Sequence, residues 1–214
     1  FTLVHNGVIE NFSELKETYL SHVNFQSQTD TEVAVNLVEY FAEKEGLSGK
    51  EACRRALKEI RGSFAFGLLD EQAPGVLYAA KHKSPLLVGV GNGFNVICSD
   101  AMATISQTDT YLEIKDEELI TITKDKVEIE TINGEVVERA PFKAELDADD
   151  IEKGAYPHYM LKEMDEQPAV LRRIIKEYTN EAGELEVPSE LLEEIGQSDR
   201  VYVVACGTSY HAGW

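Results

Sequence analysis

Apolar residues recur with helical spacing in three stretches of the first sixty positions. We predict helices over residues 12–21, after Asp30, and from Ser48 onwards. Their ends are marked by two capping-box pairs and by two glycines that stop a helix, namely Asn11 with Glu14, Ser48 with Glu51, Gly46, and Gly62. The apolar faces of the second and third helices are Val33, Leu37, Val38 and Phe41, and Ala52, Cys53, Ala56, Leu57 and Ile60.

From residue 63 the pattern changes to short apolar runs separated by Gly, Pro, Asn or Asp, which predicts strands. Several runs are apolar at successive positions, so their sheets should be covered on both faces. The fold class is therefore α/β (α+β), an α/β/β/α sandwich. The predicted strands are 64–69, 76–80, 86–90, 94–98, 111–114, 118–123, 127–132 and 136–139, the last two joined by an Asn133-Gly134 hairpin turn.

The last seventy residues are different in character. Residues 144–155 are acidic, without apolar periodicity, and predict a linker between a domain over 1–143 and a second one over 156–214. In the second domain we expect a helix over 156–178, broken or kinked at Pro168, and a short helix after Pro188. A strand over 200–205 then leads into Cys206-Gly207-Thr208-Ser209, as at the start of a doubly wound α/β domain.

The composition of the chain argues against several classes of binding function. With 39 acidic against 20 basic residues the net charge is −19, which argues against nucleic-acid and anionic-membrane binding. No apolar run approaches the roughly 18 residues that a transmembrane helix needs. Three dispersed cysteines favour a reducing, cytoplasmic location, and five histidines without ligand spacing predict no metal site. Without an initiator Met or a signal peptide, we expect a soluble internal fragment.

The stretch His5-Asn6-Gly7 follows the apolar, strand-like residues 1–4. We expect the strand to end there in a turn, and Asn-Gly between apolar residues is the usual hairpin signal. The alternative is an oxyanion hole, in which the Gly7 N–H and the Asn6 amide face developing negative charge. A helix start at Asn11, in place of a second strand, favours the oxyanion hole.

Two further stretches each allow two interpretations. Asp30 lies between threonines at a helix start, so its carboxylate is either an N-cap or a group that binds an ammonium ion. Thr208 and Ser209 follow a strand and Gly207, so they either cap a helix or begin a phosphate site at a helix N-terminus. Cys206 has no identifiable base beside it and is expected to be a buried residue at the end of a strand.

Taken together, these motifs resemble the glutamine:fructose-6-phosphate aminotransferase (glucosamine-6-phosphate synthase) family over the whole chain. The motifs that carry the resemblance are Val4-His5-Asn6-Gly7-Val8-Ile9-Glu10-Asn11, Ser27-Gln28-Thr29-Asp30-Thr31-Glu32, Lys83-Ser84-Pro85-Leu86, Ser99-Asp100, Tyr156-Pro157-His158-Tyr159-Met160 with Lys162-Glu163 and Glu166-Gln167-Pro168, and Cys206-Gly207-Thr208-Ser209-Tyr210. The first two motifs occur across N-terminal-nucleophile amidotransferases, and the last two belong with a sugar-isomerase (SIS) domain.

The resemblance implies a glutaminase domain joined to a sugar-phosphate isomerase domain, with glutamine and fructose 6-phosphate as substrates and glucosamine 6-phosphate and glutamate as products. This is the first step of hexosamine (UDP-N-acetylglucosamine) synthesis. It assigns Asn6 and Gly7 to the oxyanion hole, Asp30 to the glutamine amino group, and Thr208 and Ser209 to the sugar phosphate. It implies no cofactor and a homodimeric parent protein.

The sequence departs from the family pattern at both ends. It begins at Phe1, without the nucleophilic cysteine and the arginine-bearing segment of the family, and it stops at Trp214 within the isomerase domain. We therefore expect an inactive fragment whose sandwich is incomplete. Two alternatives remain open, namely another N-terminal-nucleophile amidotransferase of the phosphoribosyl or asparagine-forming kind, and a non-catalytic glutamine or sugar-phosphate binding module.

Overall fold

The computed structural model describes residues 1–144, 154–180, 182–205 and 207–213, except for the side chain of Thr208. The chain divides into two compact units, 1–151 and 152–214. Residues 145–153 of the predicted linker over 144–155 lie outside the described residues, so the predicted domain boundaries remain a prediction.

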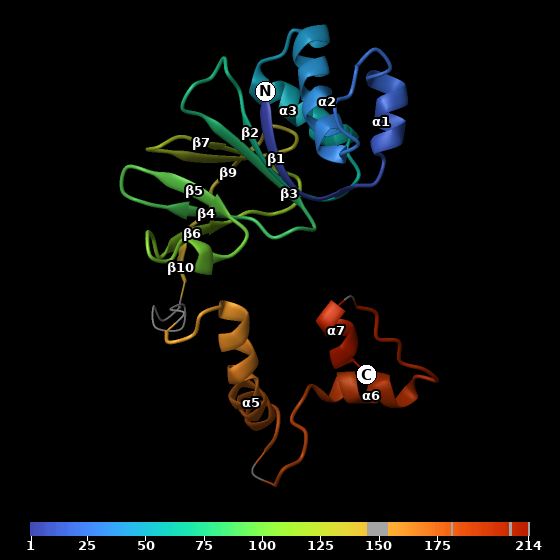
Figure 1. Ribbon diagram of the computed structural model, residues 1–214, viewed down its shortest axis with the longest axis vertical. Coiled ribbons are helices and arrows are strands. Elements are labelled where there is room, and N and C mark those ends of the chain that lie inside the picture. Colours follow the sequence, from blue (N-terminus) through green and yellow to red (C-terminus); the bar gives the residue numbers. More distant parts are fainter. Residues whose placement is uncertain (145–153, 181, 206, 214) are drawn as a thin grey trace. The chain divides into compact units, whose positions relative to one another are not determined.

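The first unit contains a layer of helices and two antiparallel sheets (Figure 1). The helices are α1 (Phe12–Tyr19), α2 (Asp30–Glu45) and α3 (Gly49–Glu59). The first sheet has the order β1-β2-β3-β7-β8-β9 and the second β10-β6-β4-β5. The strands are β1 (Thr2–Ile9), β2 (Gly62–Leu69), β3 (Leu77–His82), β4 (Leu87–Val90), β5 (Asn95–Cys98), β6 (Thr110–Glu113), β7 (Glu118–Ile122), β8 (Val127–Thr131), β9 (Val136–Val137) and β10 (Phe142–Lys143).

Local sequence signals account for the limits of α2 and α3. Thr29 and Ser48 are the N-caps, and each side chain accepts a hydrogen bond from the backbone N–H three residues later. Gly46 ends α2 in the left-handed conformation, with φ 65°. The predicted apolar stripe of α2 is buried, and it packs with the inner residues of α3 and β2 in one core. This core holds the helices against the first sheet.

A second core fills the space between the two sheets, formed by residues such as Val88, Ile120 and Ile129. On the outer face of the second sheet, the hydroxyl of Tyr111 is fully buried within hydrogen-bond distance of the carbonyl oxygens of Ala101 and Thr108, at 3.0 and 2.8 Å, and can donate its one hydrogen to either. The covering segment includes only a short 3₁₀ helix, η1 (Ala101–Ala103). In the described residues the predicted α/β/β/α sandwich is thus present with an incomplete fourth layer.

Two predictions at the start of the first unit are wrong. β1 does not end in a turn at Asn6-Gly7 but runs on to Ile9, because Asn6 and Gly7 pair with Ala65 and Phe64 of β2. Asn11 makes no side-chain cap on α1. Its amide instead donates to the carbonyl of Glu59 and accepts from the N–H of Arg61, and so ties the start of α1 to the end of α3.

The second unit contains α5 (Tyr159–Glu177), α6 (Ser189–Gln197) and α7 (Gly207–Ala212). Pro168 lies inside α5 and does not break it; a proline removes one backbone hydrogen bond, and the turns on either side keep theirs. The predicted strand over 200–205 is absent. A strand needs a neighbour to receive its backbone hydrogen bonds, and the described residues provide none for this segment.

Candidate functional site

The candidate site lies along the outer edge of β1, which is the first strand in the order of its sheet. The N–H of Glu10 donates to the carbonyl of Arg61, so it points inward, toward the residue that precedes β2. The N–H of Ile9 points the other way and donates to Asp30 Oδ2 at 2.8 Å. Because N–H groups alternate in direction along a strand, the N–H of Gly7 points to the same outer edge.

Gly7 is required by this geometry. Its φ is +134°, and a Cβ at this position would lie 2.0 Å from the carbonyl oxygen of Ser63. Only glycine lets β1 approach β2 this closely while it keeps its N–H on the outer edge. The close approach at Gly7 occurs within a strand and not at the predicted turn.

Asn6 is exposed, and its side chain is on the face of β1 opposite to His5. Its amide makes no hydrogen bond to another described side chain. Asn6 therefore places a side-chain amide on one face of β1, next in sequence to the edge N–H of Gly7. Two such donors can bind one oxyanion.

Asp30 reaches this edge from the first turn of α2. Thr29 is the N-cap of the helix, so the prediction that Asp30 could be the N-cap is wrong. The carboxylate of Asp30 is free of that role and instead accepts the N–H of Ile9. Gly7 and Ile9 are two residues apart, about 6.6 Å along a strand. The N–H of Gly7 and the carboxylate of Asp30 therefore lie along the same edge of β1, about two residues apart.

The loop before α2 holds Asp30 in place. Glu32 accepts the backbone N–H groups of Gln26 and Ser27, each at 2.6 Å, and the hydroxyl of Ser27. The hydrogen bond from Ser27, together with those from the two backbone groups, lowers the pKa of Glu32. A charged Glu32 therefore ties the loop 26–29 to the helix that carries Asp30.

His5, which the sequence analysis did not assign to the site, also contacts this helix turn. Its ring is buried, with 2% of the side chain exposed, and Nδ1 lies 3.0 Å from Thr31 Oγ1 and 3.8 Å from Asp30 Oδ1. Burial lowers the pKa of His5, against the opposing effect of the Asp30 charge. No sequence signal reports this contact, because it joins residues 26 positions apart.

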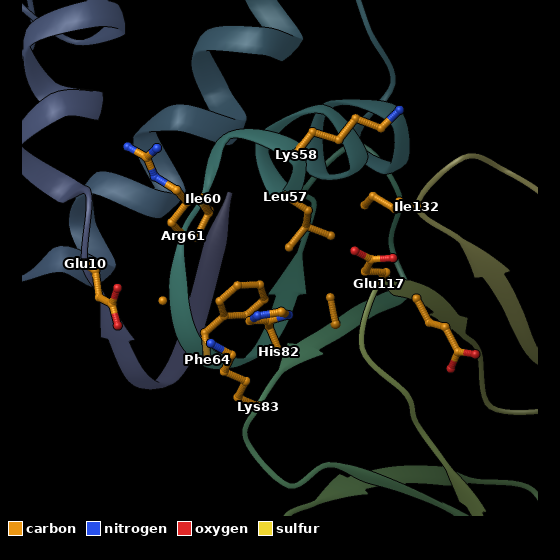
Figure 2. A pocket seen from close by; sticks show the side chains of 13 residues that line it. Glu10, Leu57, Lys58, Ile60, Arg61, Phe64, His82, Lys83, Glu117 and Ile132 are labelled. Carbon is orange, nitrogen blue, oxygen red and sulfur yellow. The ribbon is translucent and has the colours of Figure 1, made fainter.

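A separate pocket of about 520 Å³ lies where α3 ends above β2 and β3 (Figure 2). The ring of Phe64 lies next to His82 in the middle of this pocket, with the apolar side chains of Leu57 and Ile132 nearby. The pocket is not lined by Asn6, Gly7 or Asp30. The pocket is therefore distinct from the candidate site.

Cys53 is buried, and burial raises the pKa of its thiol to about 12, so this thiol cannot act as a nucleophile near neutral pH. Thr208 and Ser209 lie at the start of α7 in the second unit. The side chain of Thr208 and all of Cys206 are outside the described residues, so the phosphate site remains a prediction.

The described residues contain no group of three or more His, Cys, Asp or Glu that could hold a metal ion. No helix among them is both long enough and apolar enough to span a bilayer.

Residues 1–106 match the family model of the glutamine amidotransferase domain. Of solved structures, the chain is similar to the glutamine phosphoribosylpyrophosphate amidotransferase of B. subtilis, in its complex with ADP and GMP. The TM-score is 0.53 and the identity 24%, over 61% of this chain and 28% of that one. At this identity the likeness shows the fold alone, an N-terminal-nucleophile amidotransferase fold.

Curated relatives match along the whole chain. The glutamine–fructose-6-phosphate aminotransferases (isomerizing) of Listeria innocua, Geobacillus kaustophilus and Streptococcus agalactiae are 60%, 57% and 53% identical to it over 213, 213 and 214 residues. In each case the match covers 100% of this chain and 35% of the relative, so the chain spans about a third of their length. The chain therefore belongs to the glutamine–fructose-6-phosphate aminotransferase family.

Proposed function

We propose that the protein containing this chain transfers the amide nitrogen of glutamine to fructose 6-phosphate and forms glucosamine 6-phosphate and glutamate. The observation that carries the glutaminase part is the arrangement on the edge of β1. The N–H of Gly7 points to this edge, the amide of Asn6 belongs to the adjacent residue, and the carboxylate of Asp30, held by the N–H of Ile9, lies two residues further on.

In the proposed mechanism, the α-ammonium group of glutamine pairs with Asp30. The amide carbonyl then lies beside Asn6 and Gly7. A thiolate attacks the carbonyl carbon, and the oxygen becomes an oxyanion that accepts hydrogen bonds from the Gly7 N–H and the Asn6 amide. Collapse of this intermediate releases ammonia and leaves a thioester, which water hydrolyses to glutamate.

The nucleophile implied by the family is an amino-terminal cysteine whose own α-amino group serves as the base. The thiol of Cys53 cannot replace it, because its pKa of about 12 keeps it protonated. Ammonia then reacts with fructose 6-phosphate in the isomerase domain. We propose that Thr208 and Ser209 begin the phosphate site there, that the protein is a homodimer in the cytoplasm, and that it needs no cofactor.

The test of the oxyanion hole is the Asn6→Ala variant of the full-length protein. We expect the kcat for glutamine hydrolysis to fall about 100-fold or more, since one oxyanion donor is lost. Thr2→Ala, an exposed position on the same face of β1, is the matched control and should leave kcat unchanged. An Asn6→Ala enzyme with the kcat of the wild type would refute the role of Asn6.

The test of the ammonium site is Asp30→Asn. Asparagine can still accept the N–H of Ile9 but carries no charge, so we expect the KM for glutamine to rise about 10- to 100-fold with a smaller change in kcat. The sugar half is tested by the product. Glutaminase activity without glucosamine 6-phosphate formation from fructose 6-phosphate would indicate a different acceptor and would contradict the proposed transfer.

A further inference from the structure

His5 joins the two elements that build the candidate glutamine site. It lies on β1 directly before Asn6, and its ring points toward the first turn of α2, where Nδ1 is 3.0 Å from Thr31 Oγ1 and 3.8 Å from Asp30 Oδ1. The ring also packs edge-on against Phe66, with 5.0 Å between ring centroids and an interplanar angle of 75°. These contacts leave the imidazole little freedom to turn.

The two carboxylate oxygens of Asp30 face different neighbours. Oδ2 accepts the backbone N–H of Ile9 at 2.8 Å, and this bond fixes the carboxylate to β1. Oδ1 is the oxygen that lies nearest to the His5 ring. A hydrogen on Nδ1 can be donated to Thr31 Oγ1, and the negative carboxylate 3.8 Å away favours the tautomer that carries its hydrogen there.

Burial of the His5 ring also lowers the stability of the protein. His5 Nε2 is buried and has no hydrogen-bond partner in the described part of the chain. A buried polar atom without a partner costs about 1–3 kcal/mol. A leucine or phenylalanine at this position would avoid the cost, so packing alone does not explain an imidazole here.

The charge state of the ring matters for Asp30. Burial lowers the pKa of His5, so the ring is neutral near pH 7. A protonated ring would compete with the substrate for the charge of Asp30. A neutral ring can hold the first turn of α2 through its hydrogen bond with Thr31 and leave the full negative charge of Asp30 to an ammonium group.

We propose that His5 is a positioning residue that, through Nδ1, holds Thr31 and Asp30 so that the Asp30 carboxylate accepts the α-ammonium group of glutamine. This inference rests on the proposed glutaminase function. It assigns to His5 a part in substrate selection, namely the preference for an amide that carries an α-amino group. His5 itself contacts neither the amide nor the oxyanion.

The experiment compares two substrates in the full-length protein, glutamine and its analogue without the α-amino group, 4-carbamoylbutanoate. In the wild type we expect a clear preference in kcat/KM for glutamine. In His5→Leu the KM for glutamine should rise about tenfold, while kcat/KM for the analogue should change less than about twofold. A merely structural role would reduce both substrates alike, and that result would overturn the proposal.

Two replacements separate the ring nitrogens. The amide of Asn at position 5 can occupy the place of Nδ1, whereas the amide of Gln reaches the place of Nε2. We therefore expect His5→Asn to restore most of the preference for glutamine and His5→Gln to restore little. The reverse order would contradict the role of Nδ1.

A double variant keeps this inference separable from the proposed function. In the Asp30→Asn background, the His5→Leu replacement should have little further effect on the KM for glutamine, because both act on one contact. Full additivity of the two effects would overturn the proposal. If the wild type does not hydrolyse glutamine, the proposed function fails. If the wild type and Asp30→Asn behave as expected and His5→Leu keeps the preference for glutamine, only the role of His5 fails.

Discussion

The Gly7→Ala replacement tests the geometry of the site edge most directly. At Gly7 an alanine would meet two separate obstacles. Its φ of +134° is strained for any residue with a Cβ, and the Cβ would lie 2.0 Å from the carbonyl oxygen of Ser63, against 3.4 Å or more for an ordinary contact. To make room, β1 must move away from β2 by more than one ångström.

The expected loss in the free energy of unfolding follows from these two obstacles. Backbone strain costs about 1–3 kcal/mol. Ser63 pairs with Val8 in the ladder, and separation of the strands there weakens about two backbone hydrogen bonds, each with a net worth of about 1 kcal/mol. We therefore expect Gly7→Ala to lower the free energy of unfolding by about 3–5 kcal/mol. The N–H of Gly7 should also be displaced, so glutaminase kcat should fall.

Gly46→Ala is the matched control, because Gly46 also has a positive φ, of +65°, but has nothing within 4 Å of the position of a Cβ. Its cost should be only about 1 kcal/mol, from the backbone alone. Urea unfolding of the two variants in the full-length protein measures the difference. A difference of less than about 1 kcal/mol between them would show that the contact with Ser63 is not restrictive and would refute the reasoning.

Two further predictions concern buried charge. Arg139 donates to both carboxylate oxygens of Glu118, at 2.7 and 2.6 Å, and only 7% of the Glu118 side chain is exposed. Arg139→Met should therefore lower the free energy of unfolding by about 3 kcal/mol, and the double variant with Glu118→Gln should recover part of the loss. Equal stability of Arg139→Met and the wild type in a thermal melt would contradict this. The pKa of His5 in the folded protein lies below its ordinary value of 6.5, so on acidification the unfolded chain binds a proton before the folded chain does. The contribution of His5 to stability is therefore complete above pH 6.5 and decreases as the pH falls below it. His5→Asn should flatten the pH dependence of urea midpoints just below pH 6.5, and an unchanged slope there would argue against a buried neutral His5.

The limits of α2 and α3 were predictable from the sequence because their signals are local. Thr29, Ser48 and Gly46 act on backbone groups only a few residues away. Most strands of the first unit were also predicted to within one or two residues, and the turn at Asn133-Gly134 joins β8 and β9 as predicted. Short apolar runs between turn residues carry this information without any knowledge of their partners.

Two of the errors depend on contacts distant in sequence, and the third is local. Asn6-Gly7 is compatible with a turn or a strand, and it is strand because β2 lies alongside. Residues 200–205 are apolar enough for a strand but find no neighbour among the described residues. Asp30 looks like an N-cap by composition, but Thr29 takes that place.

The candidate site was predictable in part. Pattern and resemblance pointed to Asn6, Gly7 and Asp30, and the structure brings the edge of β1 and the start of α2 together. The roles of Ile9 and His5 were not predictable, because each depends on a hydrogen-bond partner more than twenty residues away. Burial, which makes the unpartnered nitrogen of His5 noticeable, cannot be read from a sequence.

The hydrogen bond from Ile9 to Asp30 also has a consequence for local opening of the protein. Amides on the free edge of a sheet usually exchange with solvent through small fluctuations, without unfolding. The Ile9 amide is closed by a side chain of α2, so it can exchange only when the start of this helix separates from β1. Docking of α2 and formation of the glutamine site are then one cooperative event, and a ligand that binds Asp30 slows the opening of both.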